Sequence, residues 1–169
     1  MNRTENTLRK QVRDETFKLL RANGLEGWHV RFNPRLSRAL GRCIPSQKTI
    51  EYQPRYMQQN DWAQVRTTIL HEVAHAISCT KYGRLGGGHG AAWQREAYKL
   101  GLENPSAINT TAKLTKRFTG KCDGCGNEWQ RDRRIHGAAC PPCRRTYMSE
   151  MMTAGVSKQR FSIRWTRND

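Results

Sequence analysis

The sequence lacks an apolar run long enough to cross a lipid bilayer, and its mean hydropathy is −0.86. A membrane-spanning class is therefore excluded. The first twenty residues also lack the apolar region of a secretory signal peptide, and the acidic residues Glu5, Asp14 and Glu15 argue against a transit peptide. We therefore expect a cytoplasmic protein that is not secreted and does not contact membranes.

Acidic residues are scarce, because 14 Asp and Glu stand against 30 Lys and Arg, a formal net charge of +16. The surplus is most concentrated in residues 112–169, which carry 13 Lys and Arg but only 5 Asp and Glu. Such a surplus favours a polyanionic partner, most often nucleic acid. The alternative is a solvated basic surface that keeps the protein in solution.

Cysteines are few but patterned. Of the six, Cys122/Cys125 and Cys140/Cys143 form two CxxC pairs with the spacing C-x2-C-x14-C-x2-C. Without a secretory signal, this spacing predicts a structural zinc held by four thiolates rather than disulfides. Short strand patterns around the first pair predict a zinc ribbon, in which His136 is an unnecessary substitute ligand. The isolated Cys43 and Cys79 are expected to be small buried residues rather than reactive thiols.

The length of 169 residues and the hydrophobic content of 36% suit one compact domain with a small appendage. We expect three parts: a main domain over residues 1–111, the zinc ribbon over 112–148 and a basic tail over 149–169. In the tail, Phe161, Ile163 and Trp165 alternate with polar residues. That pattern fits either an edge strand or a disordered basic arm.

Apolar periodicity predicts a mixed α+β fold for the main domain. A helical stripe over residues 8–20 ends at Asn23-Gly24. Three short strands are expected at residues 27–32, 39–44 and 48–53, separated by prolines. The simplest arrangement for them is a small antiparallel sheet packed on the helices that follow.

A long helix is expected after a cap at Asn60 or Asp61, since apolar residues recur at helical spacing up to a stop at Gly83. The glycine-rich stretch GRLGGGHG follows as a loop. A second helix, AAWQREAYKL, then ends at Gly101.

The long helix contains an HExxH motif, formed by His71, Glu72 and His75 in ILHEVAHAI. Residues four apart lie on one face of a helix, so both imidazoles can bind one ion, and zinc prefers such ligands. Burying these polar groups among apolar neighbours without a metal would be costly. Glu72 can then act as general base toward a water molecule at the metal.

A catalytic zinc site of this kind requires a third protein ligand. His89 follows three glycines that let the loop fold back over the helix, which makes it the leading candidate. Glu96, in the next helix, and Cys79, one turn beyond His75, are the alternatives.

The motifs HEVAHA and HGAAW, followed by the CxxC…CxxC module, resemble those of the SprT-like metalloprotease family, which includes the Spartan proteases. The stretch ALGRCIPSQKTIEYQPRYM before the helix is also similar to that family. The resemblance implies a zincin-like minimal metalloprotease fold, with His71, His75 and His89 as ligands of a catalytic zinc and Glu72 as catalytic residue. It also implies that Glu96 is a helix-surface residue.

The family further implies DNA-dependent proteolysis of proteins bound or crosslinked to DNA, with a role in DNA repair. The compact chain is similar to prokaryotic or phage-type members, so the expected location is a prokaryotic or phage-infected cytoplasm. We expect a monomer with two zinc ions, one catalytic and one structural.

Basic residues around the predicted ribbon are the candidates for salt-dependent contacts with DNA phosphates. Trp129 lies among them and either stacks on an unpaired base or packs the small core of the ribbon. The candidate DNA-binding residues are Lys116, Arg117, Lys121, Trp129, Arg131, Arg133, Arg134, Arg144 and Arg145.

Two rival functions remain. The chain could be a nucleic-acid-binding regulatory protein whose histidine-bound zinc is only structural and which has no protease activity. It could also be a metal hydrolase that acts on a non-peptide substrate.

Overall fold

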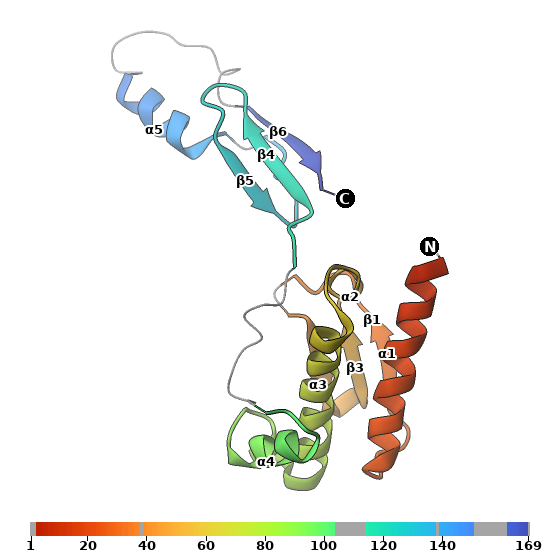
Figure 1. Ribbon diagram of the computed structural model, residues 1–169. Coiled ribbons are helices and arrows are strands. Elements are labelled where there is room, and N and C mark those ends of the chain that lie inside the picture. Colours follow the sequence, from red (N-terminus) through yellow and green to blue (C-terminus); the bar gives the residue numbers. More distant parts are fainter. Residues whose placement is uncertain (1–2, 38, 104–113, 138, 151–161, 169) are drawn as a thin grey trace. The chain divides into compact units, whose positions relative to one another are not determined.

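The computed structural model describes residues 3–37, 39–103, 114–137, 139–150 and 162–168. The chain divides into two compact units, Met1–Leu114 and Thr115–Asp169 (Figure 1). The division expected between residues 111 and 112 falls in a stretch outside the described residues. None of the helices within the described ranges combines the length and apolar character that a bilayer crossing requires.

The first unit begins with helix α1, Arg3–Ala22, which buries one apolar stripe that includes Val12 and Leu20. The helix ends where Gly24 adopts a positive φ of 71°. The amide of Leu25 then donates to the carbonyl of Leu20 at 3.0 Å, which completes a left-handed cap. The stop expected at Asn23-Gly24 is confirmed.

A three-stranded sheet follows α1, with the spatial order β1-β3-β2. Its elements are β1 (His29–Phe32), β2 (Gly41–Ile44), the 3-10 helix η1 (Pro45–Gln47) and β3 (Thr49–Tyr52). β2 and β3 pair in antiparallel register, whereas β1 and β3 run parallel. The α+β class is confirmed, but the expectation of a purely antiparallel sheet is wrong.

The mixed sheet arises from the path of the chain. The short turn of η1 joins β2 and β3 as an antiparallel hairpin, and β1 and β2 lie at opposite edges of the sheet. The last strand therefore occupies the centre, where all four of its residues are buried. β2 is left as an edge strand.

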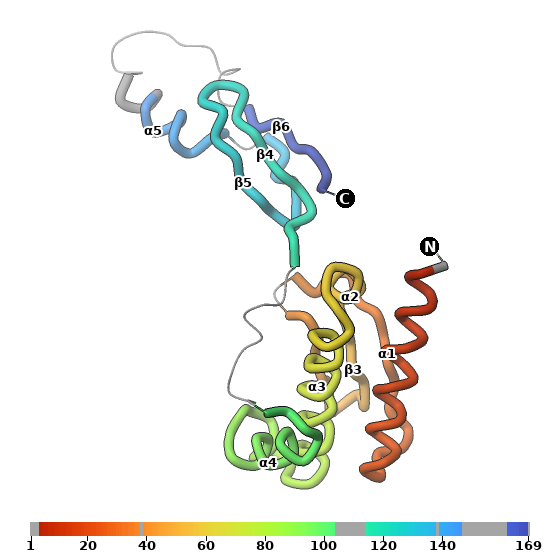
Figure 2. The backbone as a smooth tube through the Cα atoms, in the orientation of Figure 1, coloured from red at the N-terminus to blue at the C-terminus, as the bar shows by residue number. Residues whose placement is uncertain are grey.

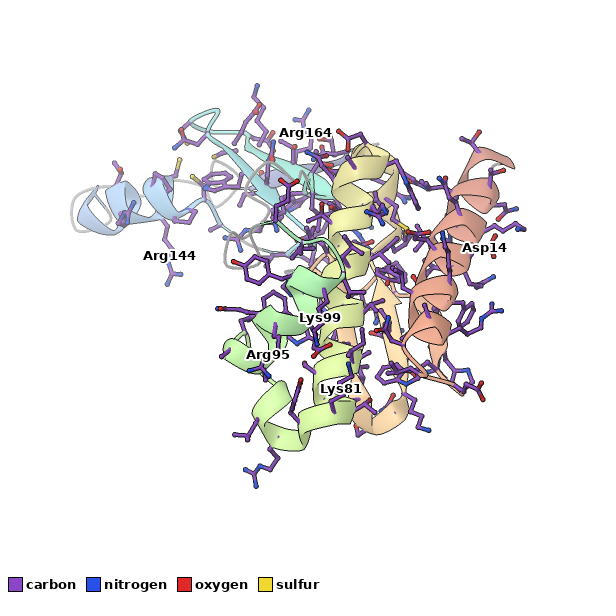
Figure 3. All side chains as sticks on the ribbon, turned by 60° about the horizontal axis from the view of Figure 1, so that its bottom comes forward. Asp14, Lys81, Arg95, Lys99, Arg144 and Arg164 are labelled. Carbon is purple, nitrogen blue, oxygen red and sulfur yellow. The ribbon has the colours of Figure 1, made fainter. Side chains whose placement is uncertain are left out.

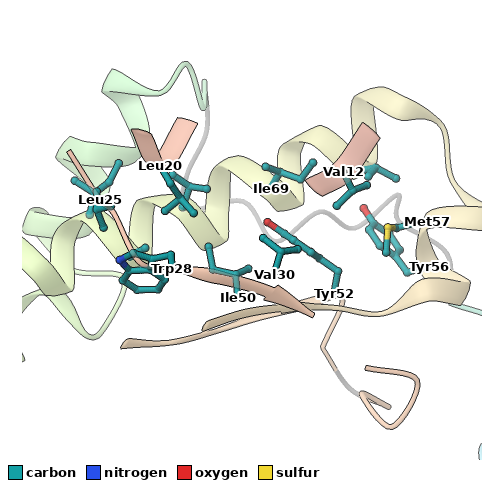
Figure 4. Packing of buried hydrophobic residues seen from close by; sticks show 14 residues of the cluster. Val12, Leu20, Leu25, Trp28, Val30, Ile50, Tyr52, Tyr56, Met57 and Ile69 are labelled. Carbon is teal, nitrogen blue, oxygen red and sulfur yellow. The ribbon is translucent and has the colours of Figure 1, made fainter. Parts of the chain in front are cut away.

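Helix α2 (Pro54–Gln59) leads into α3 (Trp62–Tyr82), the central helix of this unit. The side chain of Asp61 accepts a hydrogen bond from the amide of Gln64 at 2.8 Å, so the expected cap is Asp61. Figure 4 shows Leu20 of α1, Ile69 of α3 and Ile50 of β3 meeting between the helices and the sheet. This core fixes α3 against the sheet.

The turn η2 (Gly83–Gly86) connects α3 to α4 (Ala91–Lys99), which packs beside the C-terminal part of α3 (Figure 2). A second apolar cluster joins the two helices and contains Leu70 and Ala74 of α3 and Trp93 and Ala97 of α4. The chain leaves α4 at Gly101, which has φ 88°, as expected for a helix stop.

The second unit, Thr115–Asp169, is called the ribbon unit here. It contains β4 (Phe118–Cys122), β5 (Glu128–Arg131), α5 (Pro141–Glu150) and β6 (Ile163–Arg167). Both β5 and β6 pair with β4 in antiparallel register, in the order β5-β4-β6. Of the two alternatives for the tail, residues 163–167 adopt the edge strand, and Phe161 lies outside the described residues.

Candidate metal centres and active-site cleft

Three imidazoles from two parts of the first unit meet at one point. α3 places His71 and His75 one helical turn apart, and His89 reaches them from the loop just before α4. The Nε2 atom of His89 lies 3.0 Å from that of His71 and 3.1 Å from that of His75. The three residues, called the histidine centre here, can hold a metal ion together.

The chemistry of this donor set fits zinc. Burial lowers the pKa of His71 to about 4, with a further contribution from His89, so the ring is neutral near pH 7. Burial likewise lowers the pKa of His75 to about 3, helped by the neighbouring His71 and His89. Tetrahedral zinc with Zn–N bonds of about 2.0–2.1 Å holds adjacent nitrogens roughly 3.3 Å apart, close to the spacing seen here.

Of the three candidates for the third ligand, the structure brings His89 to His71 and His75. Cys79 lines the same cleft but does not belong to the histidine centre. Glu96 is 1% exposed on the side of α4 that faces α3, so its interpretation as a helix-surface residue is wrong.

The carboxylate of Glu96 instead accepts hydrogen bonds from three side chains at the C-terminal ends of α3 and α4. Lys81 donates to one carboxylate oxygen at 2.9 Å, and Tyr82 and Lys99 donate to the other at 2.9 and 3.1 Å (the two lysines are labelled in Figure 3). Burial alone would raise the pKa of Glu96, but these hydrogen bonds outweigh it and lower the pKa to about 2. Glu96 therefore ties α4 to the C-terminal end of α3.

Glu72 faces the edge strand β2, in the same cleft as the histidine centre. Its side chain is 6% exposed, and this burial raises its pKa to about 8, against the lowering effect of a hydrogen bond from the backbone of Cys43. A Cβ atom at Gly41 would lie 2.7 Å from Cγ of Glu72. The absence of a side chain at Gly41 therefore makes room for the carboxylate, a requirement that the sequence did not reveal.

The cleft has a volume of about 380 Å³. Gly41, Arg42 and Cys43 of β2 form one wall, and α3 and the loop with Gly87 and His89 complete it. Cys43 is half-buried, and burial raises the pKa of its thiol far above the ordinary range, with smaller contributions from Glu72 and Cys79. Burial also raises the pKa of Cys79. Both thiols are thus neutral, as expected for unreactive cysteines.

The loop that carries His89 is fastened to α3 by two neighbouring contacts. The hydroxyl of Ser78 donates to the carbonyl of Gly86 at 2.8 Å. A Cβ atom at Gly86 would overlap the carbonyl of Ser78 and lie 2.7 Å from the amide nitrogen of Cys79. Only glycine permits this approach of backbone to backbone, which no local sequence pattern predicts.

The second candidate metal centre lies in the ribbon unit and consists of Cys122, Cys125, Cys140 and Cys143. The sulfur atoms of Cys122 and Cys143 are 3.7 Å apart, and those of Cys125 and Cys140 are 3.6 Å apart. Tetrahedral zinc with Zn–S bonds of about 2.3 Å separates its sulfurs by roughly 3.8 Å, so the arrangement fits a structural zinc. His136 is not part of this cluster.

Backbone amides support the first cysteine of that cluster. The amides of Gly124 and Cys125 donate to the sulfur of Cys122 at 3.3 and 3.5 Å. Burial would raise the pKa of Cys122, but these donors lower it, which favours the thiolate that a metal requires.

The candidate DNA-binding residues fall into different environments. Lys116 pairs with Asp132 at 2.7 Å and Lys121 with Glu128 at 3.5 Å, so each has an acidic partner. Trp129 and Arg117 are half-buried. The exposed members are Arg131 at the end of β5, Arg133 and Arg134 just after that strand, and Arg144 and Arg145 on α5.

Gly86→Ala tests the fastening of the loop to α3. The added methyl group meets backbone atoms that cannot rotate away, so we expect the free energy of unfolding to fall by about 1–3 kcal/mol. Gly88→Ala, in the same loop, is the matched control, because a Cβ there meets no atom within 4 Å. Urea unfolding measures both, and equal stability of the two variants would contradict the proposed contact.

The pH dependence of stability tests the Glu96 network. In the folded protein the ionised carboxylate of Glu96 accepts hydrogen bonds from its neighbours. The contribution of this network to the free energy of unfolding is therefore complete above the ordinary pKa of 4.5 and is lost as the pH falls to about 2. Glu96→Gln should lower the free energy of unfolding by roughly 1–3 kcal/mol near neutral pH. The difference from the wild type should shrink between these two pH values in urea unfolding experiments, and a constant difference would exclude this role of the charge.

Comparison with known families gives an independent result. A model of the SprT-like family matches residues 6–116 of the chain. The match covers more than half of the 169 residues and includes the whole histidine centre, Glu72 and the edge strand β2. The four clustered cysteines lie beyond it. The chain therefore belongs to the SprT-like family.

Proposed function

We propose that the protein is a zinc-dependent protease that hydrolyses peptide bonds of proteins bound or crosslinked to DNA. The observation that carries the proposal is the shared cleft, in which three convergent imidazoles lie beside a buried carboxylate and an edge strand. Membership of the SprT-like family, which suggests a zinc-dependent, protease-like or DNA-associated role, supports it.

His71, His75 and His89 would hold the catalytic zinc through Nε2, and the four cysteines a structural one. When bound at the histidine centre, zinc supplies Lewis acidity that favours deprotonation of water and polarises a carbonyl group. Because burial keeps the rings of His71 and His75 neutral near pH 7, these two ligands need not release a proton before they bind a cation.

Glu72 is the proposed general base. Burial raises its pKa to about 8, whereas the backbone N–H of Cys43 and a cation bound at the histidine centre would both favour the ionised carboxylate that a base requires. The carboxylate takes a proton from the attacking water and passes it to the leaving amine. Its burial excludes bulk water from the carboxylate, so the proton moves within the cleft.

The edge strand β2 offers a place for the substrate. Successive residues of a strand direct their backbone groups to opposite edges. Because the N–H of Cys43 points to Glu72, away from β3, the backbone groups of Gly41 also face the free edge. An extended polypeptide can pair with this edge as an added strand, which places a peptide bond next to the histidine centre.

One face of the ribbon sheet carries unpaired positive charge. In the strand register, Phe118 lies between Arg131 and Arg167, and these three residues share a face. The guanidinium of Arg134 lies 5.3 Å from the centre of the Phe118 ring. We call Arg131, Arg134 and Arg167 the arginine face. No acidic side chain among the described residues pairs with them.

The neighbouring row of the same face is aromatic. Gly120 lies between Trp129 and Trp165, which are both half-buried, so these rings flank a strand position without a side chain. The opposite face carries Lys121 and Arg164, whose charges are balanced by Glu128 and Asp123. We propose that DNA binds the arginine face through its phosphates.

Glu72→Gln tests the protease proposal. The amide keeps the shape of the side chain but cannot accept a proton, so cleavage of a DNA-binding protein in the presence of DNA should fall by about 10²-fold or more. Zinc content and DNA affinity, measured on the same preparation, should not change. Equal cleavage rates would remove Glu72 from the mechanism, and a wild type that cleaves no protein would favour the regulatory alternative.

Replacing Arg131, Arg134 and Arg167 together by alanine tests the DNA surface. Each phosphate contact that is lost should reduce the slope of log affinity against log salt by about 1. Lys121→Ala is the matched control, because it removes a positive charge from the opposite, neutralised face. Fluorescence anisotropy with a labelled oligonucleotide at several salt concentrations measures both variants. An equal effect of both would contradict the assignment.

A further inference from the structure

The indole of Trp93 contacts all three imidazoles of the histidine centre. Its ring centre lies 4.8 Å from that of His71, 5.2 Å from that of His75 and 4.5 Å from that of His89. Trp93 is fully buried in the first turns of α4, four residues after His89. The ring thus lies beneath the point where the two ligand-bearing segments meet.

Trp93 is also hydrogen-bonded to the backbone of His71, one of the three histidines. Its Nε1–H donates to the carbonyl oxygen of His71 at 3.5 Å. Trp93 also belongs to the same buried apolar cluster as Leu70 and Ala74, the residues that precede His71 and His75 on α3. The indole is therefore held against α3, and its contact with His89 restrains the position of the loop relative to α3.

The ring planes of the three imidazoles need such a support. The last torsion of a histidine side chain is broad, so rotamer preference alone does not set the orientation of the ring. In most metal sites a hydrogen bond from the second ring nitrogen to a carboxylate or carbonyl fixes it. Within the described part of the chain, the hydrogen bonds of His71, His75 and His89 through their rings join only the Nε2 atoms to one another.

We propose that Trp93 is a positioning residue that orients the three imidazoles for metal binding by ring contacts, in place of hydrogen bonds to their Nδ1 atoms. The contacts with His71 and His89 are edge-on or perpendicular, with interplanar angles of 61° and 90°. Edge-to-face packing of this kind depends on orientation, so it restrains rotation of each ring. The proposal rests on the proposed role of the histidine centre as a zinc site.

The test compares Trp93→Leu and Trp93→Phe with Ile69→Ala in the full chain. Ile69 is equally buried but belongs to the core cluster between α3 and α1. Competition with a chelator gives the Zn²⁺ affinity of each protein. The visible spectrum of the Co²⁺-loaded protein reports ligand geometry, and its thiolate bands distinguish the cysteine centre from the histidine centre.

Trp93→Leu should weaken zinc binding at the histidine centre roughly 10–100-fold and change its Co²⁺ spectrum, as loss of a ligand-orienting group does. Trp93→Phe keeps a buried aromatic ring and should give an intermediate affinity, so it carries the test if the leucine variant does not fold. Ile69→Ala should lower the thermal midpoint but leave affinity and spectrum as in the wild type.

Two results would overturn the proposal, and they differ. If both Trp93 variants bind zinc at the histidine centre as the wild type does, Trp93 only packs the core, while the proposed function stands. If the wild type binds metal at the cysteine centre alone, the histidine centre is not a zinc site, and the proposed function fails together with the role of Trp93.

Discussion

The structure of the first unit depends on one constraint: the imidazoles of His71 and His75 on α3 must meet that of His89 from the following loop within about a hydrogen-bond length. Their mutual approach without a bound cation would leave lone pairs facing one another in a half-buried site. Helix α3 carries two of the histidines. The close backbone contact at Gly86 and the buried side chains of α4 hold the loop with His89 next to them. The sheet in turn holds α3 and places the edge strand β2 beside it.

The surroundings of Glu72 follow from the same packing. Gly41 and the amide of Cys43 belong to β2, and β2 borders α3 only because β3 occupies the centre of the sheet. The mixed strand order therefore places one free strand edge at the cleft. The cleft thus combines three histidines that can hold a cation, a carboxyl group and a strand edge, the parts on which the proposed peptide hydrolysis depends.

The sequence predicted features that depend on short-range spacing. The helical repeat placed His71, Glu72 and His75 on one helix, and the CxxC pairs predicted the cluster in the ribbon unit. Features set by tertiary packing could not be predicted from the sequence. They are the central position of β3, the burial of Glu96 with its ion pairs, and the contacts of Trp93 with the histidine centre. Arg167 was also missed, because the tail pattern left open whether strand β6 forms beside Phe118.

The metal content of the purified protein tests the central claim most directly. Elemental analysis of the wild type and of His89→Ala should give two zinc ions per chain in the wild type and one in the variant, with the cysteine centre filled in both. Two zinc ions in the variant, or a single one in the wild type, would contradict an account built on three converging histidines.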